Sequence, residues 1–255
     1  MGDSWIMQIS PARPDLPTLI CLPHAGGGAS AYRKWTALPE DLNVVAVQPP
    51  GRENRKTEPC LRQMPTLLDG IEEAIAGLTR LPYVLLGHSI GALTAYEVAR
   101  RQRLNGGPPP VCLLVSAFPP PHTLSPQPLH ELPDQALLGF LDSLQYFPQG
   151  TSRKDLVRDF LPVFRADLEV VSDYRFTPEP RFPWPIHVFG GSTDTFVAPE
   201  ALEQWGDHTD AGHSLSLLPG GHFSLFDHGG RIFETVRTAL SSSSRTSPQE
   251  VERFA

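Results

Sequence analysis

The stretch YVLLGHSIGALTAYEVA, residues 83–99, determines more about the fold than any other part of the chain. Its first half is an apolar run typical of a buried strand, and its second half has the spacing of an amphipathic helix. Between them lies GHSIG, which matches the pattern GxSxG. A sharp turn from strand to helix leaves no room for side chains at Gly87 and Gly91. We therefore predict that Ser89 is a nucleophile, the alternative being an inert serine in a glycine-bounded turn.

Short apolar runs alternate with longer helical patterns on both sides of this stretch. Strands are predicted at 18–24, 44–50, 83–89, 111–118, 186–194 and 214–222, and helices at 64–78, 90–104, 199–208 and 229–240. Most of these strands are apolar at consecutive positions, which is typical of a mostly parallel sheet covered by helices on both faces. The predicted fold class is therefore α/β, with the core formed by residues 1–118 and 186–240.

The region between the fourth and fifth predicted strands, residues 119–185, contains no convincing strand. It carries two helical patterns, and Pro162 is expected to bend or divide the second one. We expect this insertion to form a helical lid over the end of the sheet where ligands bind, the alternative being a pair of ordinary surface helices. The polar, low-complexity segment 241–255 is expected to be a disordered tail.

Composition restricts the class of protein. The chain has 255 residues, of which 40% are hydrophobic and 19% are charged, so disorder over most of its length is excluded. A net charge of −7 argues against a nucleic-acid-binding protein, which usually has a basic face. No apolar run approaches the roughly 18 residues of a membrane helix, and no leader sequence is recognised. We expect a cytoplasmic protein without a membrane partner.

A serine nucleophile needs a base and a group that orients this base. In sheets of this kind the acid and the histidine follow later strands, in the order serine, acid, histidine. GGSTD places Asp194 at the end of one predicted strand, and PGGH places His222 after the next. Both positions fall at the edge of the sheet where Ser89 also lies. The sequence therefore predicts a triad of Ser89, Asp194 and His222.

Competing residues are excluded by their positions. The other place where such folds carry the acid has the sequence SAFPPP, which offers no carboxylate. Asp227 lies beyond the histidine, whereas His24 and His88 precede the acid. Neither HExxH nor paired Cys/His spacing occurs, so no metal site is predicted.

Acyl transfer also needs N–H donors for the negative charge that develops on the carbonyl oxygen. One donor is expected to be the backbone of Ile90, the residue after the nucleophile. The second is assigned to Ala25 in the glycine-rich turn PHAGGGAS, residues 23–30. A phosphate-binding role for this turn is disfavoured because neither GxGxxG nor GxxxxGK[ST] fits it.

Taken together, these motifs resemble the type II thioesterases of polyketide and nonribosomal peptide assembly lines, together with the medium-chain acyl thioesterases of fatty-acid synthesis. The shared segments are LPHAGGGASAYRKW, QPPGRENR, GHSIGALTAYEVA, GGSTDTFV and LPGGHFSLFD, which cover nearly the whole chain. In that family the serine of GHSxGA, the aspartate of GxxDxxV and the histidine of GxHF form the triad, and they fall on Ser89, Asp194 and His222. Ser224 is a departure, because an aromatic residue is expected after HF in the pocket wall. The resemblance implies an α/β-hydrolase fold with a helical lid.

The resemblance further implies a hydrolase that removes acyl groups from the phosphopantetheine arm of acyl or peptidyl carrier proteins. Editing of stalled or mis-primed chains, through an acyl-serine intermediate, is the expected role. No cofactor of the enzyme is implied, because phosphopantetheine belongs to the substrate, and a monomer is expected. Three alternatives stay open: an esterase or lipase acting on free small esters, medium-chain release in fatty-acid synthesis, and a non-catalytic binding protein of this fold.

An acyl substrate would give the apolar side chains of the lid a role. In the second helical pattern Leu156, Phe160, Phe164, Leu168 and Val171 share one stripe. We expect a tunnel for the acyl chain, the alternative being that these side chains only pack the lid onto the body. The residues predicted to line this tunnel are Phe140, Leu144, Leu156, Phe160 and Phe164.

Charge constrains how a carrier protein could dock. Carrier proteins are typically acidic, as the resemblance implies, and this chain is acidic too. Docking therefore requires a local basic patch near the mouth of the site. The predicted patch consists of Arg33 and Lys34, which follow the glycine-rich turn, and of Arg52, Arg55 and Lys56 in GRENRK.

Overall fold

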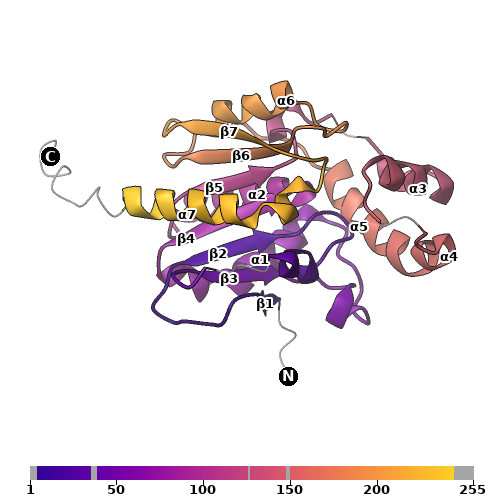
Figure 1. Ribbon diagram of the computed structural model, residues 1–255, viewed down its shortest axis with the longest axis horizontal. Coiled ribbons are helices and arrows are strands. Elements are labelled where there is room, and N and C mark those ends of the chain that lie inside the picture. Colours follow the sequence, from indigo (N-terminus) through magenta and orange to yellow (C-terminus); the bar gives the residue numbers. More distant parts are fainter. Residues whose placement is uncertain (1–4, 36–38, 126, 148–149, 244–255) are drawn as a thin grey trace, which may run out of the picture.

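A seven-stranded sheet forms the centre of the computed structural model, which describes residues 5–35, 39–125, 127–147 and 150–243 (Figure 1). The strand order is β1-β3-β2-β4-β5-β6-β7, and only β1 is antiparallel to its neighbour among these strands. The strands are β1 (Ile6–Gln8), β2 (Thr18–Leu22), β3 (Asn43–Val47), β4 (Tyr83–His88), β5 (Leu113–Ser116), β6 (Ile186–Gly191) and β7 (His213–Leu218). The six parallel strands coincide with the predicted ones, whereas β1 is too short to show a hydrophobic period and was not predicted.

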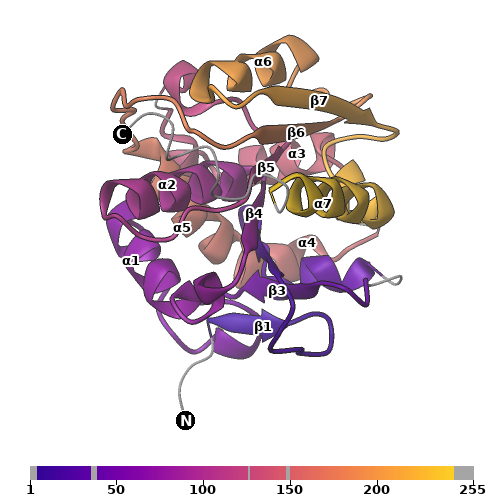
Figure 2. The ribbon, with the colours of Figure 1, turned by 90° about the vertical axis from the view of Figure 1, so that its left-hand side faces the viewer.

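Helices cover both faces of this sheet (Figure 2). They are α1 (Met64–Ile75), α2 (Ile90–Leu104), α3 (Asp134–Ser143), α4 (Arg153–Asp155), α5 (Leu161–Ser172), α6 (Pro199–Glu203) and α7 (Gly229–Ser243). In Figure 2, α1 and α2 lie on one side of the strands and α7 on the other. No helix in the described ranges is long and apolar enough to cross a membrane.

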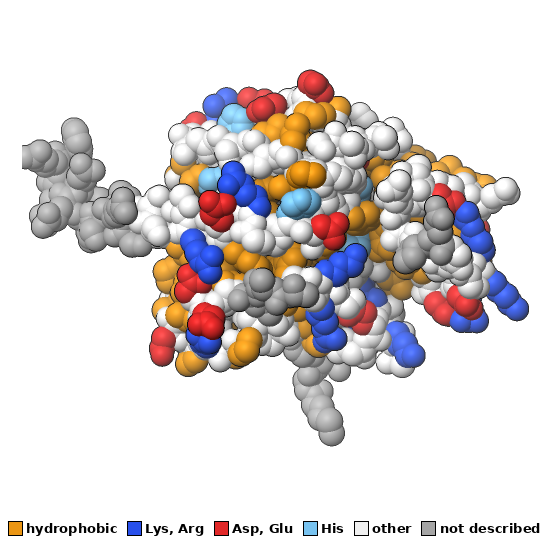
Figure 3. Space-filling view, viewed as in Figure 1, with side chains coloured by type: hydrophobic (Ala, Val, Ile, Leu, Met, Phe, Trp, Pro, Cys, Tyr) orange, Lys and Arg blue, Asp and Glu red, His pale blue; other side chains and the backbone are white. Residues whose placement is uncertain are grey.

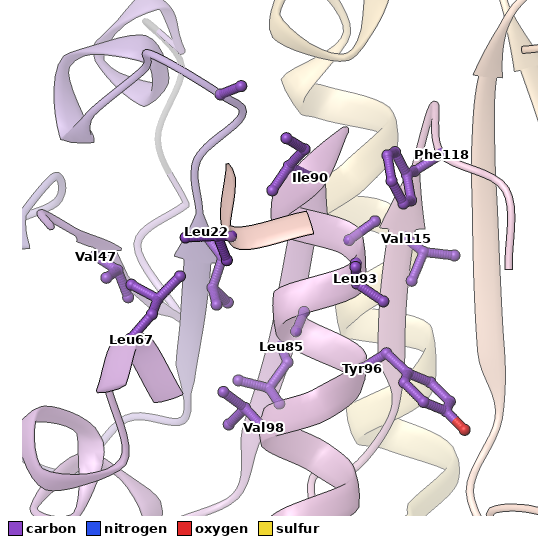
Figure 4. Packing of buried hydrophobic residues seen from close by; sticks show 14 of the residues in the cluster. Leu22, Val47, Leu67, Leu85, Ile90, Leu93, Tyr96, Val98, Val115 and Phe118 are labelled. Atoms are coloured by element: carbon purple, nitrogen blue, oxygen red, sulfur yellow. The ribbon is translucent and has the colours of Figure 1, made fainter. Parts of the chain in front are cut away.

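Alternate residues along each buried strand pack into two separate hydrophobic cores. On β2, Ile20 and Leu22 face the core under α1 and α2, while Leu19 and Cys21 face the core under α7. Figure 4 shows the first core, with Leu93 of α2 among the side chains packed there. Burial on both faces explains why these strands are apolar at consecutive positions. The edge strand β7 differs, because most of its residues are partly or fully exposed.

The insertion of residues 119–185, which we call the lid segment, lies between β5 and β6. Its α3, α4 and α5 are grouped on one side of the sheet in Figure 1. A π-helical turn, Leu156–Phe160, precedes α5, and Pro162 is the second residue of that helix. Proline is tolerated there because the first turn of a helix has no intrahelical acceptor for its N–H groups. Leu161 and Phe164 belong to the same core as α1 and α2, so the lid segment is packed firmly onto the body.

The predicted tail, residues 241–255, requires one correction. Residues 241–243 are not a tail, because α7 continues through Ser243. This helix is amphipathic, and the hydrogen bond from Ser242 Oγ to the Thr238 carbonyl oxygen accompanies its last turn. The remainder of the predicted tail, residues 244–255, lies outside the described residues.

Candidate active site

The turn that carries Ser89 is held by steric contacts that leave room only for glycine beside it. Ser89 itself has φ 54° and ψ −128°, an unusual conformation for a residue with a side chain. A Cβ on Gly87 would lie 2.0 Å from the carbonyl oxygen of Gly91, and one on Gly91 would lie 2.3 Å from that of Leu22. The Ser89 N–H donates to the Ser116 carbonyl oxygen of β5 at 2.8 Å. These contacts support the strained turn, which points Ser89 into a cavity.

The predicted acid and base are brought together across two loops. Asp194 follows β6 and His222 follows β7, so the parallel strands place both at one edge of the sheet. The Nδ1 atom of His222 lies 2.9 Å from Oδ2 of Asp194, and both side chains are almost fully buried. His222 lines the same cavity as Ser89. Over the described residues, no hydrogen bond joins Ser89 directly to His222.

Asp194 is oriented by backbone groups of its own loop. Its second oxygen, Oδ1, accepts the N–H groups of Phe196 at 2.8 Å and Val197 at 3.3 Å. Burial alone would raise the pKa of this carboxyl, but hydrogen bonds from His222 and from these two N–H groups outweigh it and lower the pKa. Asp194 is therefore ionised at neutral pH and is a suitable partner for an imidazolium ion.

Two further histidines lie close to His222 in positions unsuited to a general base. The ring of His88 is 5.3 Å from that of His222, and its Nδ1 atom lies 3.1 Å from Ser116 Oγ. His24 Nε2 lies 2.9 Å from the hydroxyl of Tyr146. Burial, with the charge of His222, lowers the pKa of His24 to about 3 and that of His88 well below its usual value. Both rings stay neutral at working pH, and neither contacts a carboxylate of the described residues.

The two predicted oxyanion donors lie on either side of Ser89. Ala25 follows β2 in the glycine-rich turn, and Ile90 is the first residue of α2; both line the cavity with Ser89. Neither backbone N–H has an acceptor among the described residues. The N-terminus of α2 adds a positive dipole at Ile90. Both N–H groups are thus available to a developing negative charge.

The cavity itself is largely apolar and has a volume of about 480 Å³. It lies between the ends of the strands and the lid segment. The residues that line it are His24, Ala25, Ser89, Ile90, Phe118, Pro119, Leu124, Ser125, Gln127, Leu129, Phe140, Leu144, Tyr146, Phe164, Leu168, Val171, Ser172, Tyr174, Phe196, Val197, Ala198, Ala201, His222 and Phe223. This volume is within the range of small-molecule sites and suits an apolar group of modest size.

The lid residues predicted to line a tunnel divide into two sets. Phe140, Leu144 and Phe164 line the cavity. Leu156 and Phe160 do not line it, and the prediction is wrong for this pair. Phe160 packs against Tyr146 and Phe147 and covers Gly26, where an added Cβ would come within 2.3 Å of its ring. Phe160 still stacks on Phe164, with ring centroids 5.6 Å apart, so the helical stripe persists, but only Phe164 of these two side chains lines the cavity.

Comparison with known proteins assigns the chain to a family. The model for the thioesterase domain matches residues 17–240. The chain belongs to the thioesterase family. The gramicidin S biosynthesis protein GrsT of Aneurinibacillus migulanus is 36% identical over 219 residues, which cover 85% of this chain and 86% of GrsT.

Solved structures place this thioesterase among the type II enzymes. The type II thioesterase BorB of the borrelidin biosynthetic cluster is 37% identical, with a TM-score of 0.84 over 94% of this chain and 99% of BorB. The RedJ thioesterase of the prodiginine pathway in Streptomyces coelicolor is 33% identical, with a TM-score of 0.81 over 90% of each chain. The predicted α/β-hydrolase fold and type II thioesterase family are thus confirmed, and the protein is a hydrolase acting on thioesters.

Several cavity residues of the thioesterase were not predicted. The ring of Phe196 lies 5.7 Å from that of His222 and 5.2 Å from that of Phe140, so it joins the acid loop to the lid segment. Its place in GGSTDTFV, two residues after the acid, is a signal that could have identified it. Tyr146 and Tyr174 carried no such signal, because their approach to the cavity depends on how the lid segment folds.

The predicted docking patch requires correction at two positions. Arg52 is 6% exposed in its side chain and forms an ion pair with Asp167 of α5. Arg55 is equally buried, binds Glu58 and lies over the ring of Trp5 at 4.8 Å. Both guanidinium groups are buried in ion pairs within the protein and are therefore not free to meet a docking partner.

The other three residues of the predicted patch remain accessible. Arg33, Lys34 and Lys56 are exposed, and none of them forms an ion pair with a described residue. On the face shown in Figure 3, basic and acidic side chains are interspersed, so any basic docking surface there is small and local.

Within the described ranges, no cluster of three His, Cys, Asp or Glu side chains is arranged to bind a metal ion. Whether the enzyme acts without a cofactor stays a prediction.

Proposed function

We propose that this thioesterase removes acyl groups from the phosphopantetheine arm of carrier proteins in a polyketide or nonribosomal peptide pathway. The reaction uses a Ser89–His222–Asp194 triad and an acyl-serine intermediate. The observation that carries this proposal is the buried Asp194–His222 pair beside the strained Ser89 turn, at the edge of a largely apolar cavity. The relatives named above from gramicidin S, borrelidin and prodiginine biosynthesis support the class of pathway.

The first half of the reaction forms the acyl enzyme. His222 Nε2 accepts the proton of Ser89 Oγ as this oxygen attacks the thioester carbonyl carbon. The carbonyl oxygen becomes an oxyanion and accepts hydrogen bonds from the N–H groups of Ala25 and Ile90. The carbon–sulfur bond then breaks, and His222 returns its proton to the departing pantetheine thiolate. Asp194 keeps the imidazole in the tautomer that leaves Nε2 free to accept.

The second half releases the acid. His222 removes a proton from water, which attacks the acyl carbon of the Ser89 ester. The tetrahedral intermediate collapses, and the proton returns to Ser89 Oγ as the carbon–oxygen bond breaks. Phosphopantetheine remains on the carrier, so the enzyme itself needs no cofactor. Hydrolysis of the wrong acyl group in this way frees a stalled carrier arm, which is the editing role.

Turnover of a panel of acyl-loaded carrier proteins with increasing chain length tests this function. We expect kcat/KM to be higher on carrier-bound acyl groups than on free esters with the same acyl chain. Equal or better turnover of free esters would favour an esterase. A sharp preference for medium fatty-acyl chains on a fatty-acid-synthesis carrier would favour release of medium-chain products.

Chain-length preference is expected to depend on the cavity wall. Phe164→Ala should shift the preference toward longer acyl chains, because Phe164 lines the cavity and loses its ring. Val157→Ala serves as the control on the same lid segment, because Val157 is exposed and does not line the cavity, and its chain-length profile should stay that of the wild type. Phe164→Ala can cost about 3–5 kcal/mol of stability, so both variants are compared at a temperature where each is folded. An unchanged profile for a folded Phe164→Ala variant would remove this side chain from the acyl site.

Docking of the carrier is expected to use the accessible basic residues. The triple change Arg33→Glu, Lys34→Glu and Lys56→Glu should raise KM for a carrier-bound substrate by about tenfold at low salt, since interface charges mainly govern encounter. KM for a small soluble thioester should not change. Arg80→Glu is the control. This exposed residue precedes β4, so it lies at the amino ends of the parallel strands, away from the site at their carboxyl ends. Equal effects on both substrates would show that the patch supports the site rather than the partner.

A further inference from the structure

The peptide group between Ala25 and Gly26 is held on both sides by side chains of the lid segment. Its carbonyl oxygen, on Ala25, accepts a hydrogen bond from the hydroxyl of Tyr146 at 3.2 Å. Its N–H, on Gly26, donates to Oδ2 of Asp167 at 2.7 Å. Tyr146 follows α3 and Asp167 lies in α5, so two separate parts of the lid segment fix one peptide plane of the body.

Asp167 is itself anchored by a buried arginine of the body. Arg52 forms two hydrogen bonds with its carboxylate, from Nη1 at 2.6 Å and from Nη2 at 2.8 Å. The Nη1 atom also donates to the carbonyl oxygen of Gly27 at 2.9 Å. The side chains of Arg52 and Asp167 are 6% and 13% exposed. A buried bidentate pair of this kind fixes both the position and the orientation of the Asp167 carboxylate.

The loop held in this way needs an external restraint. Residues 26–28 are three consecutive glycines, and Gly26 has φ +72°, a conformation that glycine adopts and leaves at little cost. The Ala25 N–H, the proposed oxyanion donor, belongs to the peptide immediately before the one that is held. An oxyanion donor is effective only if it is fixed before charge develops on the substrate. Rotation of the adjoining peptide would turn Ala25 N–H away from the cavity.

We propose that Asp167 and Tyr146 are positioning residues of the oxyanion hole, which orient Ala25 N–H by holding the Ala25–Gly26 peptide from the lid segment. The lid segment thereby completes the catalytic site as well as enclosing the cavity. This inference rests on the proposed function of the same site. It assigns to Arg52 the role of anchoring Asp167 in place of the docking role predicted from the sequence.

A purely mechanical role, in which Asp167 only fastens the lid segment, makes a different prediction. The helix α5 carries a second carboxylate that pairs with a body arginine, Glu169 with Arg62. That pair does not touch the glycine-rich turn. Glu169→Gln therefore removes a lid-to-body ion pair while leaving the oxyanion loop untouched, and it is the matched control for Asp167→Asn.

The test compares Asp167→Asn, Tyr146→Phe and Glu169→Gln on a small soluble substrate, S-butanoyl-N-acetylcysteamine, which needs no carrier docking. For Asp167→Asn and Tyr146→Phe we expect kcat to fall about tenfold or more with KM within about twofold, the pattern of an interaction made only in the transition state. Butylboronic acid forms a tetrahedral adduct with a serine nucleophile. Its affinity for these two variants should fall by about the same factor as kcat. Glu169→Gln should keep the wild-type kcat and the wild-type affinity for the boronic acid.

Tyr146→Phe keeps the proposal testable if the charge left on Arg52 prevents Asp167→Asn from folding. It removes only a hydroxyl group and leaves the aromatic wall of the cavity in place. A folded Tyr146→Phe variant with wild-type kcat would overturn the proposal, as would equal losses in Asp167→Asn and Glu169→Gln. Failure of the proposed function is distinguishable, because free esters would then be turned over at least as well as carrier-bound acyl groups, or Ser89→Ala would remain active.

Discussion

Ser89→Ala is expected to lower thioester turnover by about 10⁴-fold or more, because the variant has no oxygen with which to form the acyl enzyme. Release of free thiol from an acyl thioester, followed with a thiol-reactive dye, measures this loss directly. The acyl-serine ester that is proposed for the wild type, detectable as a mass increase after rapid quenching, should be missing. The fold should persist, since the turn is held by backbone and glycine contacts that an Ala at this position leaves unchanged.

Ser192→Ala provides the control for this experiment. Ser192 is an exposed residue of the loop that also carries Asp194, and its N–H donates to the Leu218 carbonyl oxygen, a bond that an Ala retains. Its turnover should match that of the wild type. Residual activity of Ser89→Ala within about tenfold of the wild type would exclude Ser89 as the nucleophile.

Asp194→Asn is expected to reduce kcat by roughly 10³- to 10⁴-fold while changing KM little. The backbone contacts of Asp194 explain why the loss should be so large. Two N–H groups, from Phe196 and Val197, point at Oδ1, so they hold the amide oxygen of an Asn at that position. The amide NH₂ must then face His222 Nδ1, which has to accept. This forces the ring proton onto Nε2, where it blocks proton transfer from Ser89.

Asp227→Asn is the matched control for the acid. Asp227 is the exposed last residue of the short 3-10 helix Ser224–Asp227, whose other residues are buried; it lies five residues after His222 and carries the same charge as Asp194. Its removal should leave kcat within about twofold of the wild type, since surface charges contribute little. If Asp227→Asn lost more activity than Asp194→Asn, the acid of the proposed triad would be misassigned. Steady-state kinetics on one small thioester at saturating substrate separates the two variants.

The central sheet alone determines the positions of the main groups of the proposed site. Ser89, Asp194 and His222 follow β4, β6 and β7, and the donor Ala25 follows β2. Because these strands are parallel, each loop emerges at the same edge. Asp194 lies 105 positions after Ser89 in the chain, and His222 lies 133 positions after it. The sheet can nevertheless bring these residues together without any contribution from the lid segment.

The lid segment contributes what the sheet does not. Its Phe140 and Phe164 form part of the cavity wall, and its Tyr146 and Asp167 hold the turn that bears Ala25. The two roles overlap at Tyr146, which also lines the cavity, whereas Asp167 does not line it. Phe164→Ala and Asp167→Asn should thus separate acyl preference from the chemical step within this one segment.

The sequence by itself determined the six parallel strands, the serine turn and the end of these strands at which the acid and base lie. Consecutive apolar residues identify buried parallel strands, and GHSIG allows only one kind of turn because its glycines leave no space for a Cβ. These features depend on residues close together in the chain and on a topology with few alternatives. For that reason Ser89 and His222 line one cavity, and Asp194 is paired with His222.

Only the tertiary structure decided which lid side chains face the cavity and which arginines are free. Phe160 stacks on Phe164 as the shared stripe predicts, yet its ring also packs on Tyr146 and covers Gly26, and only Phe164 of this pair lines the cavity. The sequence predicts that Arg52 is a surface charge beside the mouth of the active site. In the structure it is buried against Asp167, which lies 115 residues later in the chain. Side-chain direction and ion pairing depend on how the lid helices dock on the body, and docking is governed by contacts between distant residues that no local pattern encodes.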